Sequence, residues 1–234
     1  KIAKTYLGVG VEQHSNALGE AKNVELNVFD GPCPAGNVGV QVNNIDPVNK
    51  GEVVWTVDPA SVIFFGRLFL TGRVDLHKKV AVAGSEMKQT GYANVLVGTP
   101  FSAFVEAQLK TTAHVRLING NPLTGTKTTM ADYVGGHTSE ITAIPEGDDC
   151  DEMLGWILPR TNQFSTSRSY LSWLFGKKKE YNLDARIKGG ERHMIMSGEY
   201  DQVLPMDIFG EYLIKAIIAG DIDKQEQLGI YEVS

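Results

Sequence analysis

The chain has 234 residues, 42% of them hydrophobic, which is enough apolar material for one large or two to three small cored domains and excludes a disordered protein. Its 28 acidic residues outnumber the 22 basic ones, and the net charge is −6. Such a chain lacks the concentrated basic face that nucleic-acid binding needs, and anionic lipid repels it as a whole, so both classes of partner are disfavoured.

The sequence also argues against a membrane-spanning, exported or thiolate-metal protein. Its longest apolar runs, near residues 62–65 and 217–219, are broken by charges, whereas a spanning helix takes ~20 apolar residues. No signal-peptide pattern follows Lys1, which makes the cytosol the default setting. The two cysteines, Cys33 and Cys150, form no CxxC motif, so neither a disulfide framework nor an iron–sulfur site is expected.

The first part of the chain, residues 1–88, is predicted to mix helices and strands. Residues Lys1–Leu7 are interpreted as the tail of a helix, and the alternation of Asn23–Phe29 predicts a strand. An aspartate followed by proline at residues 58 and 59 predicts the start of a helix that ends at Gly72. Its apolar side chains are enough to cover a sheet.

Residues 89–145 are predicted to form a compact α+β module of short strands around one small helix. The strands before and within it are expected at Lys79–Ala83, Ala93–Val97 and His114–Ile118, because each is a short apolar or alternating run bounded by turn residues. The helix is expected at Ser102–Leu109.

Residues 146–234 are predicted to be a further α+β region, entered through the acidic loop Glu146–Glu152. The expected elements are strands at Tyr181–Ile187 and His193–Met196, helices at Met206–Gly220 and Ile222–Leu228, and a strand at Gly229–Val233.

One stretch of this region, Leu154–Trp173, has neither helical nor strand periodicity, yet it contains two tryptophans, a proline and arginines. Such a composition indicates a segment kept for shape or contact, although ordinary core packing is the alternative for each aromatic side chain. The basic run Lys177–Lys179 is interpreted as a solvated turn, or else as a contact with a partner or a lipid headgroup.

Two glycine-rich strings are incomplete versions of nucleotide-binding motifs. The string GVGVEQ, from Gly8, has Gln13 where a dinucleotide fingerprint needs a small residue, and no strand is predicted before it. The string GNPLTGTKTT, from Gly120, has Thr126 between the second glycine and Lys127, which favours a hairpin over a phosphate loop.

No catalytic or metal-binding constellation is evident. The five histidines show no HxxxH or HxH pair, and the acidic loop Glu146–Glu152 lacks the glycine and the spacing of a calcium loop. The hydroxyl residues around Arg168 do not form a GxSxG motif. We therefore predict no catalytic residue and no metal site, and interpret the acidic loop as solvated.

Long strings along nearly the whole chain carry a specific resemblance. The strings GPCPAGNVGV, VIFFGRLFLTG, RLINGNPLTGTK, IPEGDDCDEMLGWILPR, FSTSRSYLSW and PMDIFGEYLIKAIIAGDIDKQEQLGIYEV resemble the A subunits of the sodium-pumping NADH:quinone oxidoreductases. The resemblance implies a peripheral component of the complex at the cytoplasmic face of the inner membrane, with no flavin or iron–sulfur cluster of its own. It implies other subunits of the complex, membrane subunits among them, as partners, and quinone as the substrate of the complex.

The resemblance also implies a fold class, α/β followed by α+β. Residues 1–88 would be the later part of a Rossmann-like domain, as in the flavoprotein subunit of respiratory complex I, and residues 89–145 a soluble-ligand-binding β-grasp (SLBB-type) module. The chain would be a central fragment without the N-terminal domain and the C-terminal helical segment of the family. Cys33 departs from the family pattern, in which histidine is expected in the GPxPAG loop.

Two hypotheses about function follow. In the first, the chain is a scaffold without redox chemistry, and a set of side chains contacts a partner subunit or the quinone. This set comprises Trp156, Phe164, Arg168, Tyr170 and Trp173. In the second, the chain binds a nucleotide or flavin through the glycine loops at Gly8, Gly31 or Gly120.

Overall fold

The computed structural model describes residues 3–149, 155, 157–165, 168–175, 179–187, 191 and 193–233. The chain divides into two compact units, one of residues 1–56 with 192–234 and one of residues 57–191. None of the helices among the described residues has the length and apolar character that a membrane crossing requires.

The first unit begins with two parallel strands, β1 (Tyr6–Gly10) and β2 (Glu25–Phe29), joined through the short helix α1 (Asn16–Gly19). The strand predicted at Asn23–Phe29 is confirmed. The helix predicted at Lys1–Leu7 is wrong, because pairing with β2 places Tyr6 and Leu7 in a strand. The GVGVEQ motif therefore does have a strand leading into it, contrary to the prediction.

Further helical elements follow in this unit: α2 (Val38–Ile45), α5 (Gly210–Ala219), α6 (Ile222–Gln227) and the single-turn 3₁₀ helix η3 (Ile230–Glu232). The two predicted C-terminal helices are confirmed, although α5 starts four residues later than expected. Asp221 caps α6, since its Oδ1 accepts a hydrogen bond from the backbone N–H of Lys224 at 3.1 Å. The strand predicted at Gly229–Val233 is wrong: Gly229 has φ +94 and turns the chain into η3.

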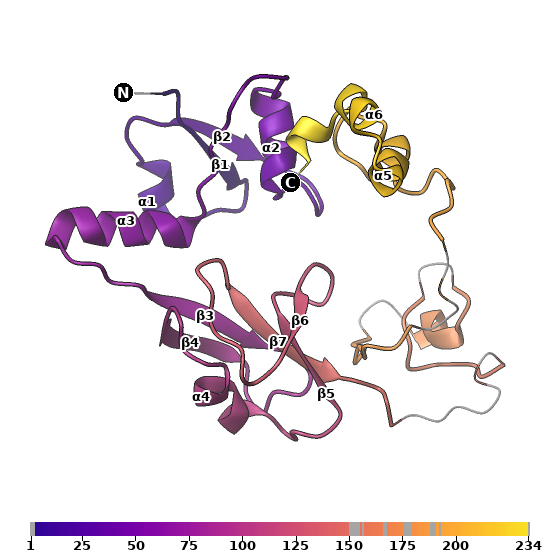
Figure 1. Ribbon diagram of the computed structural model, residues 1–234. Coiled ribbons are helices and arrows are strands. Elements are labelled where there is room, and N and C mark those ends of the chain that lie inside the picture. The colour runs from indigo at the N-terminus through magenta and orange to yellow at the C-terminus, as the bar shows by residue number, and fades with distance from the viewer. Residues whose placement is uncertain are drawn as a thin grey trace. The chain divides into compact units, whose positions relative to one another are not determined.

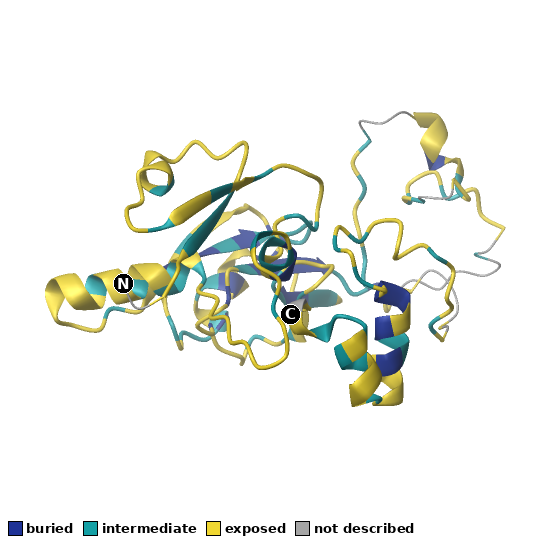
Figure 2. Ribbon diagram, turned by 90° about the horizontal axis from the view of Figure 1, so that it is seen from above, coloured by how far each residue is buried: buried dark blue, intermediate teal, exposed yellow. Residues whose placement is uncertain are grey.

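Helix α3 (Pro59–Thr71) starts and ends where the sequence predicts. The backbone N–H of Ser61 donates to Oδ1 of Asp58 at 2.9 Å, and Gly72 adopts the left-handed conformation with φ +67. The predicted packing of its apolar face on a sheet is not observed, because none of its 13 residues is buried. Phe69 is 86% exposed, and α3 is yellow and teal along its length in Figure 2.

The second unit is built on a mixed five-stranded sheet of β3 (His77–Ala83), β4 (Gly91–Leu96), β5 (Val115–Asn119), β6 (Thr126–Thr128) and β7 (Glu140–Pro145). The strand order is β4-β3-β7-β5-β6, and only β3 and β7 run parallel (Figure 1). The strands predicted near residues 79–83, 93–97 and 114–118 are confirmed. Because β3 pairs with β4, the sheet includes a strand on each side of the domain boundary expected at residue 88.

The core of this unit lies between the sheet and a short helical segment, α4 (Ser102–Val105) with η1 (Glu106–Gln108), which confirms the predicted helix. Phe101, Val105 and Ile141 are fully buried in it. The other members of the cluster are Val80, Val82, Met87, Val95, Leu109, Leu117, Val134 and Ala143.

Strands are not found where the sequence predicts them after the acidic loop. Neither residues 181–187 nor residues 193–196 form a strand, although all of them are described. Only one backbone hydrogen bond, from Ala185 N–H to the carbonyl of Pro145 at 3.0 Å, joins the first of these stretches to the end of β7. Among the described residues no strand ladder forms along this alternating apolar pattern. The only regular element described between residues 155 and 187 is the 3₁₀ helix η2 (Leu171–Phe175).

One carboxylate joins three strands of the sheet. Glu146, just after β7, accepts two hydrogen bonds from the Arg116 guanidinium on β5, at 2.8 and 2.6 Å, and one from Nζ of Lys127 on β6 at 3.1 Å. Its side chain is 20% exposed, so solvent screens these contacts only in part. The Arg116 guanidinium and the Lys127 ammonium together lower the pKa of Glu146 to about 2.

Glu146→Gln is expected to lower the free energy of unfolding at pH 7 by roughly 1–3 kcal/mol, because it leaves the Arg116 charge without its carboxylate. Glu146 stabilises the fold above its ordinary pKa of 4.5, and this contribution is lost as the pH falls toward about 2. Urea unfolding at several pH values measures it, and the two proteins should converge near pH 2. Glu106→Gln, at an exposed position of η1, is the matched control. Equal loss in both variants at pH 7 would contradict the prediction.

Candidate functional site

Four of the five predicted contact residues are described, in one irregular stretch around η2, and three of these four are exposed: Phe164, Arg168 and Trp173. Phe164 is 60% exposed and Trp173 49% exposed, whereas Tyr170 is half-buried. Trp156 lies outside the described residues. Phe164 and Trp173 are therefore accessible for contact, and their assignment as contact residues stays a prediction.

Within this stretch, cationic side chains lie over aromatic rings. The Arg168 guanidinium is 5.9 Å from the Trp173 ring centre, and that of Arg160 is 5.8 Å from the Tyr170 ring centre. Such cation–π contacts contribute about 0.5–1 kcal/mol at exposed positions. Arg168 with Trp173, and Arg160 with Tyr170, thus form two separate pairs of a cation and a ring.

A third group contains one predicted contact residue, Phe164, and residues that the sequence did not predict as contacts. Phe164 meets Tyr181 edge-on with ring centres 5.8 Å apart, and Nζ of Lys179 lies 4.9 Å from the Phe175 ring centre and 5.6 Å from that of Tyr181. The sequence placed Tyr181 in a strand and Lys179 in a basic turn. The signal that could have found them was composition alone, namely a run of three lysines between Phe175 and Tyr181.

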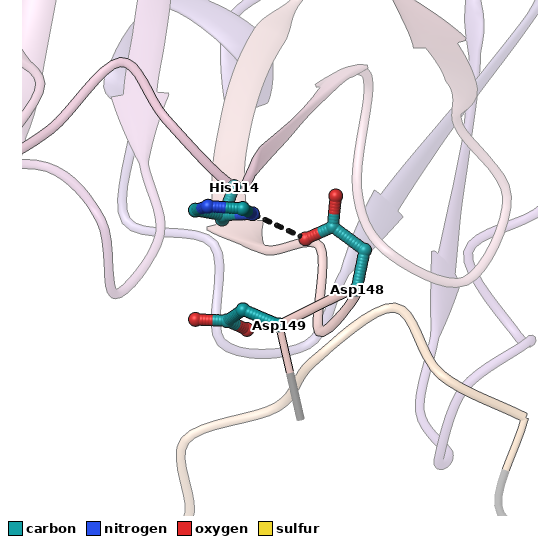
Figure 3. A group of neighbouring side chains, drawn as sticks. All are labelled: His114, Asp148 and Asp149. Carbon is teal, nitrogen blue, oxygen red and sulfur yellow. Dashed lines mark hydrogen bonds and ion pairs between the residues drawn. The ribbon is translucent and has the colours of Figure 1, made fainter. Parts of the chain in front are cut away.

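The described residues that could hold a cation are His114, Asp148 and Asp149, whose candidate ligand atoms all lie within 4.8 Å of one another. Figure 3 shows Asp148 reaching the His114 ring, with Asp149 beside it. His114 precedes β5, and Asp148 follows β7, so the antiparallel pairing of these strands brings the two ends together. No sequence pattern indicated this group, because 34 residues separate His114 from Asp148.

All three side chains are exposed, and the interaction already present is an ion pair. Nδ1 of His114 lies 2.7 Å from Oδ1 of Asp148, and this hydrogen bond, with the attraction of the carboxylate charge, raises the pKa of His114. A cation bound here would first have to displace the proton from the imidazole. The arrangement therefore behaves as a proton-binding pair, and the predicted lack of a metal site stays a prediction.

The glycine motifs have structural roles in this fold. A Cβ at Gly8 would lie 2.2 Å from Oε1 of Gln41, so the amide of this α2 residue occupies the space beside β1. Gly120 has φ +107, and a Cβ there would lie 3.0 Å from the Cα of Gly125, which fits a tight β5–β6 connection. Lys127 pairs with Glu146. The space beside Gly8 and the Lys127 ammonium are thus both engaged by other side chains of the chain.

A shallow hollow of about 230 Å³ lies beside the edge strand β4, and no sequence signal indicated it. Gln89, Thr90, Tyr92, Phe104 and Gln108 are among its lining residues. Its volume is below the 300–1,000 Å³ of typical small-molecule sites, and its lining residues include no acid, base or histidine. It does not by itself define a ligand.

Two family models match consecutive parts of the chain. Residues 1–74 match the model described as "NqrA second alpha/beta domain", and residues 79–130 match an SLBB-type model described as "NQRA C-terminal domain". The two matches meet at the junction of α3 and β3 and together cover more than half of the chain.

Curated relatives share one designation, the A subunit of Na(+)-translocating NADH-quinone reductase. Those of Vibrio atlanticus (strain LGP32) and Neisseria meningitidis serogroup B are 35% identical over 212 and 214 residues, which is 90% and 91% of this chain. That of Pasteurella multocida (strain Pm70) is 34% identical over 212 residues. The chain spans about half the length of the curated relatives it matches, 47% in each case.

Asp148→Asn is expected to lower the pKa of His114 toward its ordinary value of 6.5, because it removes the carboxylate that stabilises the imidazolium. An NMR titration of the His114 ring protons measures the change. Stabilisation from this ion pair is complete below the ordinary pKa and is lost as the pH rises through the raised one. Asp149→Asn, which removes a more weakly acting charge, should shift the midpoint less. An unchanged midpoint in Asp148→Asn would show that the ion pair does not form in solution.

Proposed function

The chain belongs to the NqrA family, the A subunits of the Na(+)-translocating NADH-quinone reductases, and on this premise we propose that it works within such a complex, which couples NADH oxidation by quinone to sodium transport. The observation that carries the proposal is the ordered match of two NqrA domains together with 35% identity over 90% of the chain. The proposed location is the cytoplasmic face of the inner membrane, where the chain is a peripheral component.

The chain's own part in this proposal is that of a scaffold without a flavin or an iron–sulfur cluster. Two observations support it: the space beside Gly8 is occupied by Gln41, and Lys127 is engaged by Glu146. These are the positions through which the alternative hypothesis, a nucleotide- or flavin-binding domain, would have to work. Gly31, the third glycine of that hypothesis, precedes an exposed Cys33, which offers no cluster ligand set by itself.

The proposed fold assignment is that residues 1–88, of which 1–74 match the NqrA second alpha/beta domain, are the later part of a Rossmann-like domain. The parallel β1–α1–β2 arrangement supports it, since a parallel pair with a crossover is the repeating unit of such folds. The sheet that follows belongs to the SLBB-type domain. In this interpretation the first domain keeps the scaffold of a nucleotide-binding fold and has lost the backbone loop that would bind the phosphates.

The proposed contact surface is the stretch around η2, and the side chains proposed to contact a partner subunit or the quinone are Trp156, Phe164, Arg168, Tyr170 and Trp173. The exposure of Phe164 and Trp173 supports this assignment, because large apolar side chains gain from being covered. Partner subunits and quinone are the ligands that this surface would meet.

Equilibrium binding tests the absence of a redox group. We expect the purified chain to be colourless and to bind neither FMN nor NADH at micromolar concentrations, measured by fluorescence titration and calorimetry. A quinone analogue is titrated in parallel. Micromolar binding of FMN or NADH would refute the scaffold role and favour the alternative hypothesis.

Assembly is tested by co-purifying the full-length protein with its membrane partners. Phe164→Ala is expected to reduce the recovered complex severalfold, because it removes an exposed ring that the partner would otherwise cover. Leu123→Ala, at an 89% exposed position on the β5–β6 connection, should leave recovery unchanged. Both isolated variants should melt at the wild-type temperature. If Phe164→Ala unfolds the protein, Phe164 belongs to the core instead.

A further inference from the structure

The 3₁₀ helix η2 turns its polar residue inward and its apolar residues outward. Ser172 is 2% exposed, whereas Leu171, Trp173, Leu174 and Phe175 are 46–62% exposed. A turn that faces only water has the reverse arrangement, because burying apolar surface is favourable and burying a hydroxyl is not. The side chains of η2 are therefore arranged to enter a less polar environment than water.

The sequence around η2 is basic, although the chain as a whole is acidic. Between Gly155 and Gly190 there are seven basic residues and two acidic ones, in a chain of net charge −6. The basic residues are Arg160, Arg168, Lys177, Lys178, Lys179, Arg186 and Lys188, and the acidic ones are Glu180 and Asp184. Charges separated by more than about 10 Å are screened at physiological salt, so the local balance decides what this surface attracts.

Three of these cations lie against the rings of the same stretch. Arg160, Arg168 and Lys179 are within 6 Å of the centres of Tyr170, Trp173 and Phe175 respectively. Lys179 also donates a hydrogen bond to the backbone carbonyl of Thr161. Tryptophan and tyrosine beside lysine and arginine are typical of the membrane–water interface, where rings sit at headgroup depth and cations meet lipid phosphates.

We propose that η2, together with Arg168 and Lys179 beside it, docks on an anionic lipid surface. Leu171, Trp173 and Phe175 would enter the interfacial layer while Arg168 and Lys179 meet phosphate groups. The inference rests on the proposed function, which places the chain beside a membrane. An anionic lipid interface offers this segment both negative charge for the cations and apolar cover for the rings.

The test uses the purified chain and vesicles without any partner protein. Sedimentation with vesicles of phosphatidylcholine and 30–40% phosphatidylglycerol, roughly the range in which anionic lipid attracts basic segments, should show binding that falls as salt rises. Vesicles of phosphatidylcholine alone should bind at least tenfold more weakly. Equal binding to both vesicle types would overturn the role of the cations.

Variants locate the contact. Arg168→Gln and Lys179→Gln are each expected to weaken vesicle binding about fivefold, and Trp173→Ala about tenfold. Lys22→Gln and Trp55→Ala, both at exposed positions outside the segment, are the matched controls and should bind as the wild type does. Circular dichroism and melting confirm that every variant is folded. Loss in the controls equal to that in the segment variants would overturn the assignment.

The two proposals fail separately. If the full-length protein co-purifies with its partners but the chain ignores anionic vesicles, lipid docking is refuted and the proposed function stands. If Arg168→Gln and Lys179→Gln then reduce co-purification, the occupant of this surface is an acidic protein. If the vesicles are bound and no partner co-purifies, lipid docking stands and the proposed function is refuted.

Discussion

The ion pairs of Glu146 with Arg116 and Lys127 are the interactions on which the His114–Asp148 pair and the segment around η2 both depend. It joins the end of β7 to β5 and β6, and the backbone N–H of Glu146 donates to the carbonyl of His114 at 2.7 Å. This pins the start of β5 against the loop that carries Asp148. The chain continues from this loop toward η2. The His114–Asp148 pair and the segment around η2 are therefore both attached at one corner of the sheet.

Gly147 shows why this corner tolerates little change. Its φ is +77, and a Cβ there would lie 2.6 Å from Cγ of Arg186. Together with the hydrogen bond from Ala185 to Pro145, this brings the chain back to its point of departure after some forty residues. The segment that holds η2 thus leaves the sheet after β7 and returns to the same place. This keeps η2 attached to a well-packed sheet, although the described residues of the segment have almost no regular structure.

The parts of the fold that sequence reasoning predicted are those set by local chemistry. Asp58, Gly72 and Asp221 mark helix ends through contacts with residues at most four positions away, and the short apolar runs of β3, β4 and β5 mark strands. The features that sequence reasoning did not predict are contacts between residues far apart in the sequence. Nothing near Tyr6 indicates a partner at Glu25, and the His114–Asp148 pair exists only because β5 and β7 are antiparallel. The contact residues around η2 came from composition, whereas their pairing with Lys179 and Tyr181 needed the structure.

A uniformly basic protein would meet an anionic membrane in many orientations. Here the segment around η2 carries an excess of positive charge while the chain as a whole is at −6, so the remainder is more acidic than the net charge suggests. An anionic surface attracts the one and repels the other, and opposite signs of interaction select orientation more than they add affinity. The acidic composition, which argues against lipid binding when only the total is considered, is therefore compatible with docking through the basic segment around η2.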